Sequence, residues 1–141
     1  MSRYILDSDV LSLLQWGDEN VTAHIRSRSP EEIATTVISV EEQLSGWYRL
    51  LRRAKTAQDL VPVYERMCGA IQFLSGLPLL TFTLSAANTY EHLRKQHRRI
   101  GRMDLRIASI VIAHDGILVT RNAVDFEGIE ELKYVDWTKK K

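Results

Sequence analysis

Apolar positions follow two different spacings along the chain. Short apolar runs that suit β-strands occur at Tyr4–Leu6, Ile33–Thr36, Leu79–Thr81, Ile117–Thr120 and Lys133–Val135. In the longer segments between them, apolar residues recur with the period of an amphipathic helix. Helices are therefore predicted at Ser8–Gln15, Val21–Arg28, Ser39–Arg53, Asp59–Leu74, Ser85–Arg99 and Asp104–His114. Strands that alternate with helices predict an α/β fold in which helices cover both faces of a parallel sheet.

Composition limits the classes of protein to which the chain can belong. Its 141 residues, of which 45% are apolar and 26% charged, suit one globular domain spanning residues 1–141. A net charge of +1 means that a nucleic acid would have to be bound by a local cluster of positive charge. A single cysteine, Cys68, excludes an internal disulfide and a cysteine metal cluster.

The sequence has no pattern typical of membrane insertion or export. Its longest apolar run, Ile107–Ala113, is far shorter than the roughly 18 residues of a membrane helix and contains Ser109. Asp7 and Asp9 interrupt the apolar N-terminal segment, so it does not have the apolar core of a signal peptide. We expect a cytoplasmic protein that does not contact a membrane.

Four acidic residues occupy strand ends or helix starts. Asp7 directly follows the first strand, Glu42 lies in the first turn of the predicted third helix, Asp104 begins the sixth helix and Asp125 follows the fourth strand. A parallel sheet could bring all four to one edge, where their mutual repulsion would require a cation. Oxygen ligands without Cys or His favour Mg²⁺ or Mn²⁺. Such an ion activates a water and neutralises a phosphodiester, so the pattern predicts metal-assisted phosphodiester hydrolysis.

Each acidic residue also has a purely structural interpretation. Ser39 and Glu42 match a capping box, Asp104 could stabilise a helix start, and Asp125 could be a turn residue. Asp7 is harder to explain in this way, because it follows a buried strand and its carboxylate needs a partner. The prediction of a site therefore depends on the set rather than on one residue.

Four segments together resemble a known family. YILDSDVLSLL, VISVEEQLSG, GRMDLRIASI and LVTRNAVDFEGI, in this order and spacing, resemble the successive motifs of PIN-domain ribonucleases, specifically the VapC-type toxins of toxin–antitoxin pairs. The resemblance covers nearly the whole chain. It implies a three-layer α/β/α domain with a five-stranded parallel sheet, Mg²⁺- or Mn²⁺-dependent endoribonuclease activity, neutralisation by a cognate antitoxin, and a homodimer.

The resemblance also assigns site residues. It places catalytic metal ligands at Asp7, Glu42 and Asp104, and leaves the fourth position open between Asp125 and Asn122. Some members of the family have aspartate where this chain has Asn122, which can ligate through its oxygen but removes a charge. Asp9, interpreted as a capping or supporting residue, stands where relatives often have asparagine, and its carboxylate could restore that charge from another direction.

A basic segment leads into the third acidic motif. Between Glu91 and Arg106 the chain has a run of basic residues, and we predict RNA contacts for Arg94, Lys95, Arg98, Arg99 and Arg102. The alternative is a solvated helix end whose positive charges offset the helix dipole. The aromatic residues Trp16, Trp47 and Tyr48 are interpreted as core or subunit-interface residues, with base stacking as the alternative.

Two other functional classes remain open from the sequence. One is a catalytically silent PIN-like interaction module, which Mg²⁺-dependent cleavage would distinguish from an enzyme. The other is a phosphoacceptor receiver domain, which needs an aspartate at the end of a middle strand. The predicted middle strands end instead at Thr36 and Thr81.

Overall fold

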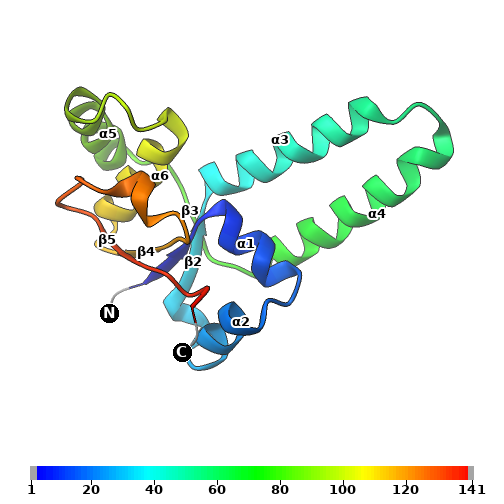
Figure 1. Ribbon diagram of the computed structural model, residues 1–141, viewed down its shortest axis with the longest axis horizontal. Helices are drawn as coiled ribbons and strands as arrows, with labels where there is room; N and C mark the ends of the chain where they lie inside the picture. Colours follow the sequence, from blue (N-terminus) through cyan, green and yellow to red (C-terminus); the bar gives the residue numbers. More distant parts are fainter. Residues whose placement is uncertain (1–2, 140–141) are drawn as a thin grey trace.

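Five parallel strands form the centre of the molecule in the computed structural model, which describes residues 3–139 (Figure 1). The strands are β1 (Tyr4–Leu6), β2 (Ile33–Thr36), β3 (Leu79–Leu80), β4 (Ile117–Val119) and β5 (Lys133–Val135). Their order is β3-β2-β1-β4-β5, and every neighbouring pair is parallel. The predicted five-stranded parallel sheet is confirmed. Receiver domains have the flavodoxin-like order 2-1-3-4-5, so the sheet does not favour that alternative.

Helices pack on both faces of this sheet. They are α1 (Ser8–Gln15), α2 (Glu19–Arg26), α3 (Val37–Arg53), α4 (Ala57–Leu74), α5 (Leu84–Gln96) and α6 (Arg102–Ala113), with short 3₁₀ helices at Pro30–Glu32 (η1) and Ala123–Phe126 (η2). Ile5 belongs to a core shared with α5 and α6, whereas the next residue, Leu6, belongs to a core shared with α1 and α2. Successive strand residues point to opposite faces, so this alternation confirms the three-layer arrangement.

Threonine and aspartate caps set where the helices begin. The side chains of Asp18, Thr36, Thr56 and Thr83 each accept a hydrogen bond from the helix's backbone, and the helix starts at the next residue. The predicted starts of these helices, one or two residues later, are therefore wrong. Thr36 Oγ1 accepts from the Ser39 N–H at 3.1 Å, which makes Ser39 a residue of the first turn. The capping-box interpretation of Ser39 and Glu42 is wrong, and Glu42 lies in the second turn.

The predicted fifth helix also ends too late. Helix α5 stops at Gln96, so Arg98 and Arg99 lie in the connection to α6 rather than on a helix. Of the residues predicted to contact RNA, only Arg94 and Lys95 lie in the last turn of α5. The sixth helix begins at Arg102, two residues before Asp104.

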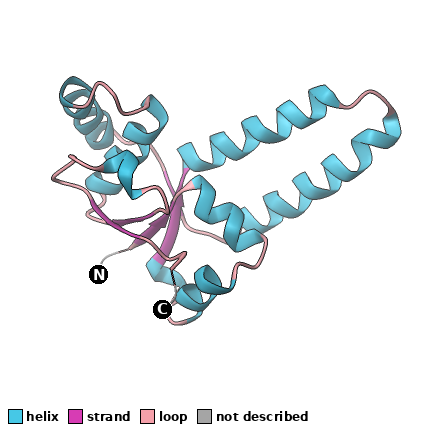
Figure 2. Cartoon of the chain, viewed as in Figure 1, coloured by secondary structure: helices cyan, strands magenta, loops and turns pink. Residues whose placement is uncertain are grey.

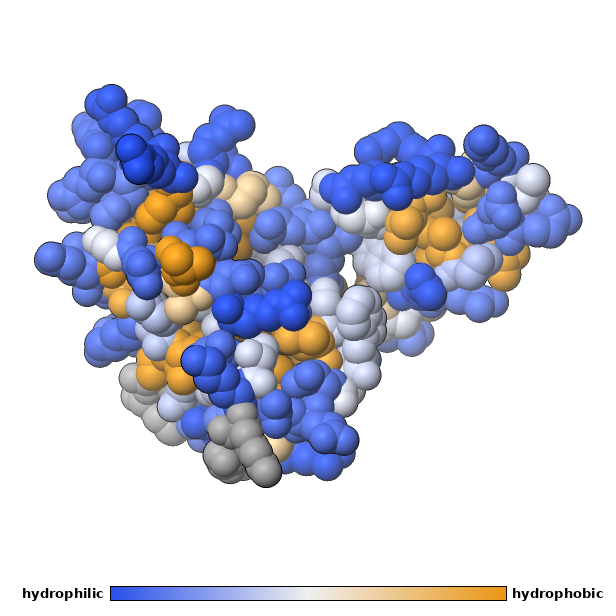
Figure 3. Space-filling model, viewed as in Figure 1, coloured by the Kyte–Doolittle hydropathy of each residue, from blue (hydrophilic) through white to orange (hydrophobic). Residues whose placement is uncertain are grey.

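Helices α3 and α4 form an antiparallel arm that projects away from the sheet (Figures 1 and 2). Near the sheet, α3 buries Ile38 and Ser39, but farther out α3 and α4 pack only against each other (Figure 1). Val61, Tyr64 and Ile71 of α4 are therefore about half exposed. Apolar patches on the projecting arm are visible in Figure 3. Among the described residues, no helix combines the length and apolar character needed to cross a membrane.

Candidate active site

Asp7 lies at the centre of the carboxyl edge of the sheet. It directly follows β1, the middle strand, and its N–H donates to the Val119 carbonyl at the end of β4 at 3.1 Å. The chain runs from β1 to β2 and β3 on one side and then crosses from β3 to β4 on the other side of β1, and open α/β sheets bind ligands at such a switch point. The Asp7 Oδ1 accepts from the Val10 N–H at 3.0 Å, so Asp7 is also the N-cap of α1.

Burial and neighbouring acids keep this carboxyl group hard to ionise. Asp7 is only 7% exposed. Its pKa is raised to about 6, mainly by burial and in part by the charges of Asp9 and Asp104, while hydrogen bonds from Thr120 and Val10 act in the opposite direction. Capping of α1 explains the hydrogen bond from Val10 but not the other acids near Asp7, since a cap alone does not require them.

Glu42 and Asp104 complete the group around Asp7. Burial raises the pKa of Glu42 to about 7, and the charges of Asp104, Asp7 and Asp9 act in the same direction. The pKa of Asp104, in the first turn of α6, is raised by burial and then by Asp125 and Asp9. The structure therefore brings Asp7, Glu42 and Asp104 close enough for their charges to interact, although they come from three distant parts of the sequence.

Asp9 has a larger place in this group than its sequence suggested. Its charge raises the pKa of Asp7, of Glu42 and of Asp104. It accepts a hydrogen bond from Asn122 Nδ2 at 2.9 Å and forms an ion pair with Arg121 at 3.5 Å. Capping of α1 falls to Asp7 instead. The feature of the sequence that could have indicated this is the spacing of two residues between Asp7 and Asp9, which places Asp9 in the first turn of the helix that Asp7 caps.

The two candidates for the fourth position lie on the same side of the group. The side-chain amide nitrogen of Asn122 points toward Asp9, and the backbone N–H of Asn122 donates to Thr120 Oγ1 at 3.0 Å. Asp125 lies in η2, is exposed, and contributes its charge to the raised pKa of Asp104. Asn122 is thus a direct partner of Asp9, while Asp125 acts on Asp104 through its charge.

The chemistry of these donors fits a hard divalent cation. All are carboxylate or amide oxygens, and the raised pKa values show that their negative charges are poorly compensated. Within residues 3–139, however, no three Asp, Glu, His or Cys side chains lie in an arrangement that would hold a metal ion as it stands. The donor set therefore fits Mg²⁺ or Mn²⁺ by its chemistry, while the side-chain spacing does not form a coordination shell.

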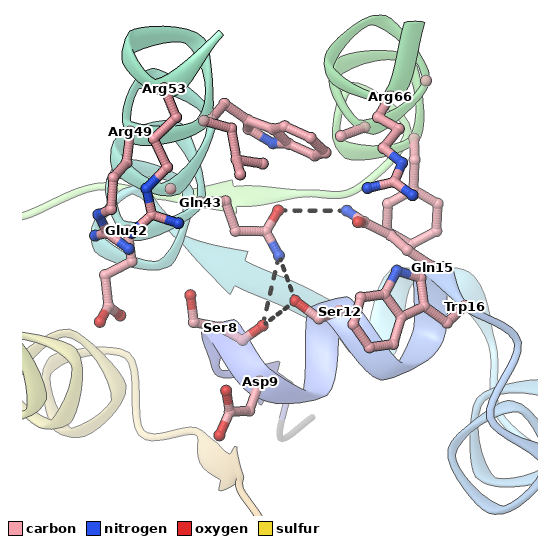
Figure 4. Close-up of a pocket in the computed structure, with 16 residues that line it drawn as sticks. Ser8, Asp9, Ser12, Gln15, Trp16, Glu42, Gln43, Arg49, Arg53 and Arg66 are labelled. Atoms are coloured by element: carbon pink, nitrogen blue, oxygen red, sulfur yellow. Dashed lines mark hydrogen bonds between the residues drawn. The ribbon is translucent and has the colours of Figure 1, made fainter. Parts of the chain in front are cut away.

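A groove opens beside the acidic group, between α1 and the arm (Figure 4). It has a volume of about 1060 Å³ and reaches Asp9 and Glu42 at one end. Gln43 links its two sides, because its side chain accepts from Gln15 Nε2 at 3.3 Å and donates to Ser12 Oγ at 3.3 Å. We call it the arginine groove, after the cationic residues Arg49, Arg53 and Arg66 in its lining.

Three other residues that the sequence singled out lie on the surface, namely Arg94, Trp16 and Tyr48. Arg94 forms an ion pair with Glu91 at 2.8 Å on the surface of α5, as a solvated helix end would. Trp16 is 82% exposed and Tyr48 is 49% exposed, so the core alternative is wrong for these two, while the subunit-interface alternative stays a prediction. The buried tryptophan is Trp137, which packs against Tyr4 with 5.0 Å between ring centroids.

Comparisons with known proteins relate the chain to one group. No family model matches it. It is 29% identical to Ribonuclease VapC1 of Haemophilus influenzae strain R2866, over 86% of this chain and 96% of that protein. It is also similar in structure to a chain of VapBC2 from Rickettsia felis bound to a promoter DNA fragment, with a TM-score of 0.74, 24% identity, and 95% and 98% of the two chains covered. For VapBC-1 from nontypeable Haemophilus influenzae the TM-score is 0.70, the identity 22%, and the coverage 96% and 98%.

Proposed function

Since the chain resembles the VapC-type PIN-domain ribonucleases in sequence and has the fold of their VapBC structures, we propose that it is a metal-dependent endoribonuclease and the toxin of a type II toxin–antitoxin pair. The observation that carries this proposal is the group formed by Asp7, Glu42 and Asp104. Three acids whose pKa values are all raised meet at the switch point of the sheet. A purely structural role would not require them to meet there.

Each residue has a distinct role in this proposal. Asp7, Glu42 and Asp104 would hold Mg²⁺ or Mn²⁺, and Asp125 or Asn122 would complete the set. When bound, the cation would neutralise charge on the RNA phosphodiester and lower the pKa of a coordinated water. Asn122 orients Asp9 through the 2.9 Å hydrogen bond and keeps that carboxylate next to the group. Thr120 stabilises the ionised form of Asp7, the form that binds a cation.

Partners follow from the same proposal. Two similar structures, from Klebsiella pneumoniae and Mycobacterium tuberculosis, are described as a toxin–antitoxin complex and as a member of the VapBC family of toxin–antitoxin systems, and we propose a cognate antitoxin for this chain. A homodimer in the cytoplasm and RNA contacts by Arg94, Lys95, Arg98, Arg99 and Arg102 belong to the same hypothesis. Arg102 supports it best, because it begins the helix that carries Asp104.

The test is cleavage of total RNA by the purified chain, with Mn²⁺ and with EDTA. We expect cleavage only with Mn²⁺, and we expect Asp104→Asn to reduce the rate at least about a hundredfold while the protein stays folded. Asp115→Asn is the matched control, since Asp115 is exposed just beyond the opposite end of α6 and its positive φ suits asparagine. Full activity of Asp104→Asn would refute the site. A wild-type chain that binds its antitoxin but cleaves no RNA would instead be a silent interaction module.

A further inference from the structure

The arginine groove contains cationic and aromatic side chains that the acidic group does not use. Arg49 and Arg53 of α3 lie on the same helix face as Glu42, because they follow it by seven and eleven residues. Arg66 approaches from α4, and Trp16 lies at the end of α1 across the groove (Figure 4). Within residues 3–139, none of these arginines is within ion-pair distance of a carboxylate. Their charge is therefore available to a ligand.

We propose that the arginine groove binds the single-stranded RNA segment next to the cleaved phosphodiester, an inference that rests on the proposed ribonuclease function. Guanidinium groups bind phosphates, and an exposed indole gives an unpaired base a surface on which to stack. Trp16 is 82% exposed, so the face of its indole is accessible to a base. A nucleotide offers both partners at once, whereas an acidic peptide offers the arginines a charge but the indole no flat base.

The groove also has the direction that this proposal needs. It runs from Asp9 and Glu42, at the acidic group, outward along α3 toward Arg53. At about 1.5 Å per helical residue, Glu42 and Arg53 are separated by roughly 16 Å along the axis, enough for a few nucleotides. RNA held along this path would enter the acidic group from the side of the arm.

Two glycines inside the arm helices support a ligand in this space. Gly46 and Gly69 both line the groove, and a Cβ added at either would meet no atom within 4 Å. Close packing within the protein therefore does not explain them, although glycine destabilises a helix interior relative to alanine. A ligand that occupies the groove would explain why this space stays open on both helices.

The test measures binding of a short fluorescent single-stranded RNA in an Asp104→Asn background, so that the probe stays intact. We expect Arg53→Gln to weaken binding severalfold and to reduce the slope of log K against log salt by about 0.7. Arg52→Gln is the matched control, because it removes the same charge from the same helical turn but lies outside the groove. Trp16→Ala should weaken binding of single-stranded RNA by about five- to a hundredfold, and binding of duplex RNA much less.

Equal effects of Arg53→Gln and Arg52→Gln would overturn the proposal. A second result would also overturn it. If the double variant Arg49→Gln and Arg53→Gln bound RNA as the wild type does but no longer captured the cognate antitoxin, the groove would be a protein-binding site. Failure of the ribonuclease function is distinguished separately, because it appears as absent cleavage by the wild-type chain with Mn²⁺. The groove proposal would fail alone if cleavage persisted while Arg53 and Trp16 proved irrelevant to RNA binding.

Discussion

At the residue scale, Asp7 combines two roles that make opposite demands. As the N-cap of α1 it works equally well as aspartate or asparagine, because either side chain can accept the Val10 hydrogen bond. In the proposed metal site it must remain a carboxylate that ionises, although burial and the nearby acids oppose ionisation. A nearly isosteric substitution therefore separates the two roles.

Asp7→Asn should be at least as stable as the wild type in EDTA and less stable than it in saturating Mn²⁺. Its folded-state pKa of about 6 exceeds the ordinary 3.8, so ionising Asp7 at neutral pH costs at most about 3 kcal/mol at 1.36 kcal/mol per pKa unit. Asparagine removes this cost. In Mn²⁺ the wild type gains RT ln(1 + [L]/Kd), about 2.7 kcal/mol at a hundred times Kd, and the variant gains less. Melting curves under both conditions measure the difference.

The pH dependence of the same variant supplies its control. Between pH values of about 4 and 6, the raised pKa of Asp7 leaves the folded state with more bound protons than the unfolded state. The stability of the wild type in EDTA therefore falls as the pH rises through this range. The advantage of Asp7→Asn should therefore be absent near pH 4 and complete above about pH 6.5. A variant that is less stable in EDTA and gains as much from Mn²⁺ as the wild type would show that Asp7 is only a cap.

At the element scale, the position of Glu42 depends on where α3 begins. Thr36 ends β2 and caps α3 through its 3.1 Å bond with the Ser39 N–H, and it is fully buried. This cap sets which turn of α3 faces the acidic group. Under the proposed function, the start of the helix therefore matters for activity as well as for stability.

Thr36→Ala should destabilise the chain by about 1 to 2 kcal/mol in urea unfolding and also lower the rate of RNA cleavage, because Glu42 loses its fixed position. Thr56→Ala is the matched control: Thr56 caps α4 through an equivalent 3.1 Å bond to the Asp59 N–H, at the exposed tip of the arm. It should cost a similar or smaller free energy of unfolding and leave the cleavage rate unchanged. Equal loss of activity in both variants would show a general effect of stability.

The caps also explain which elements could be predicted from the sequence. Strand positions follow from short apolar runs, and the predicted and observed strands differ by at most one residue at an end. The start of α3 could not be found in this way, because the β-branched run Ile33–Val40 suits a strand throughout and only the side chain of Thr36 divides it. Apolar periodicity detects the buried part of a helix, while its first turn is often polar and depends on hydrogen bonds.

The candidate site could be predicted only in part, for a similar reason. Strand ends identify Asp7, and the resemblance of four motifs adds Glu42 and Asp104. The arginine groove depends on the angle at which the arm leaves the sheet, which no local pattern encodes. Arg49 and Arg53 look like any basic helix end in the sequence, and Trp16 gives no sign that it is exposed rather than buried.

At the scale of the whole molecule, positive charge lies on two sides of the acidic group. The arginine groove lies along the arm, and the basic segment lies at α5 and the start of α6 (Figure 1). Figure 3 shows the surface hollowed between these two parts of the molecule. An RNA bound across the hollow would have phosphates on either side of the proposed cleavage point.

Replacing Arg98 and Arg99 together by alanine should therefore weaken RNA binding and reduce its salt dependence. If both contact phosphates of single-stranded RNA, the slope of log K against log salt should fall by roughly 1.4. Arg26→Ala is the control, because Arg26 is exposed on α2 at the opposite end of the molecule from α5 (Figure 1). An unchanged slope in the double variant would leave the segment as a solvated connection between two helices.

The central place of β1 also constrains the order in which the enzyme can become active during its synthesis. This strand is made first, yet its partner β4 pairs Ile117 with Tyr4 and is made near the end. Asp104 belongs to the helix that directly precedes β4, so its place beside Asp7 depends on a strand pair that closes late. A ribosome that stops before β4 leaves a fragment without the completed acidic group. Under the proposed ribonuclease function, the nascent chain would therefore be unable to cut RNA near the ribosome that makes it until almost the whole protein has been synthesised.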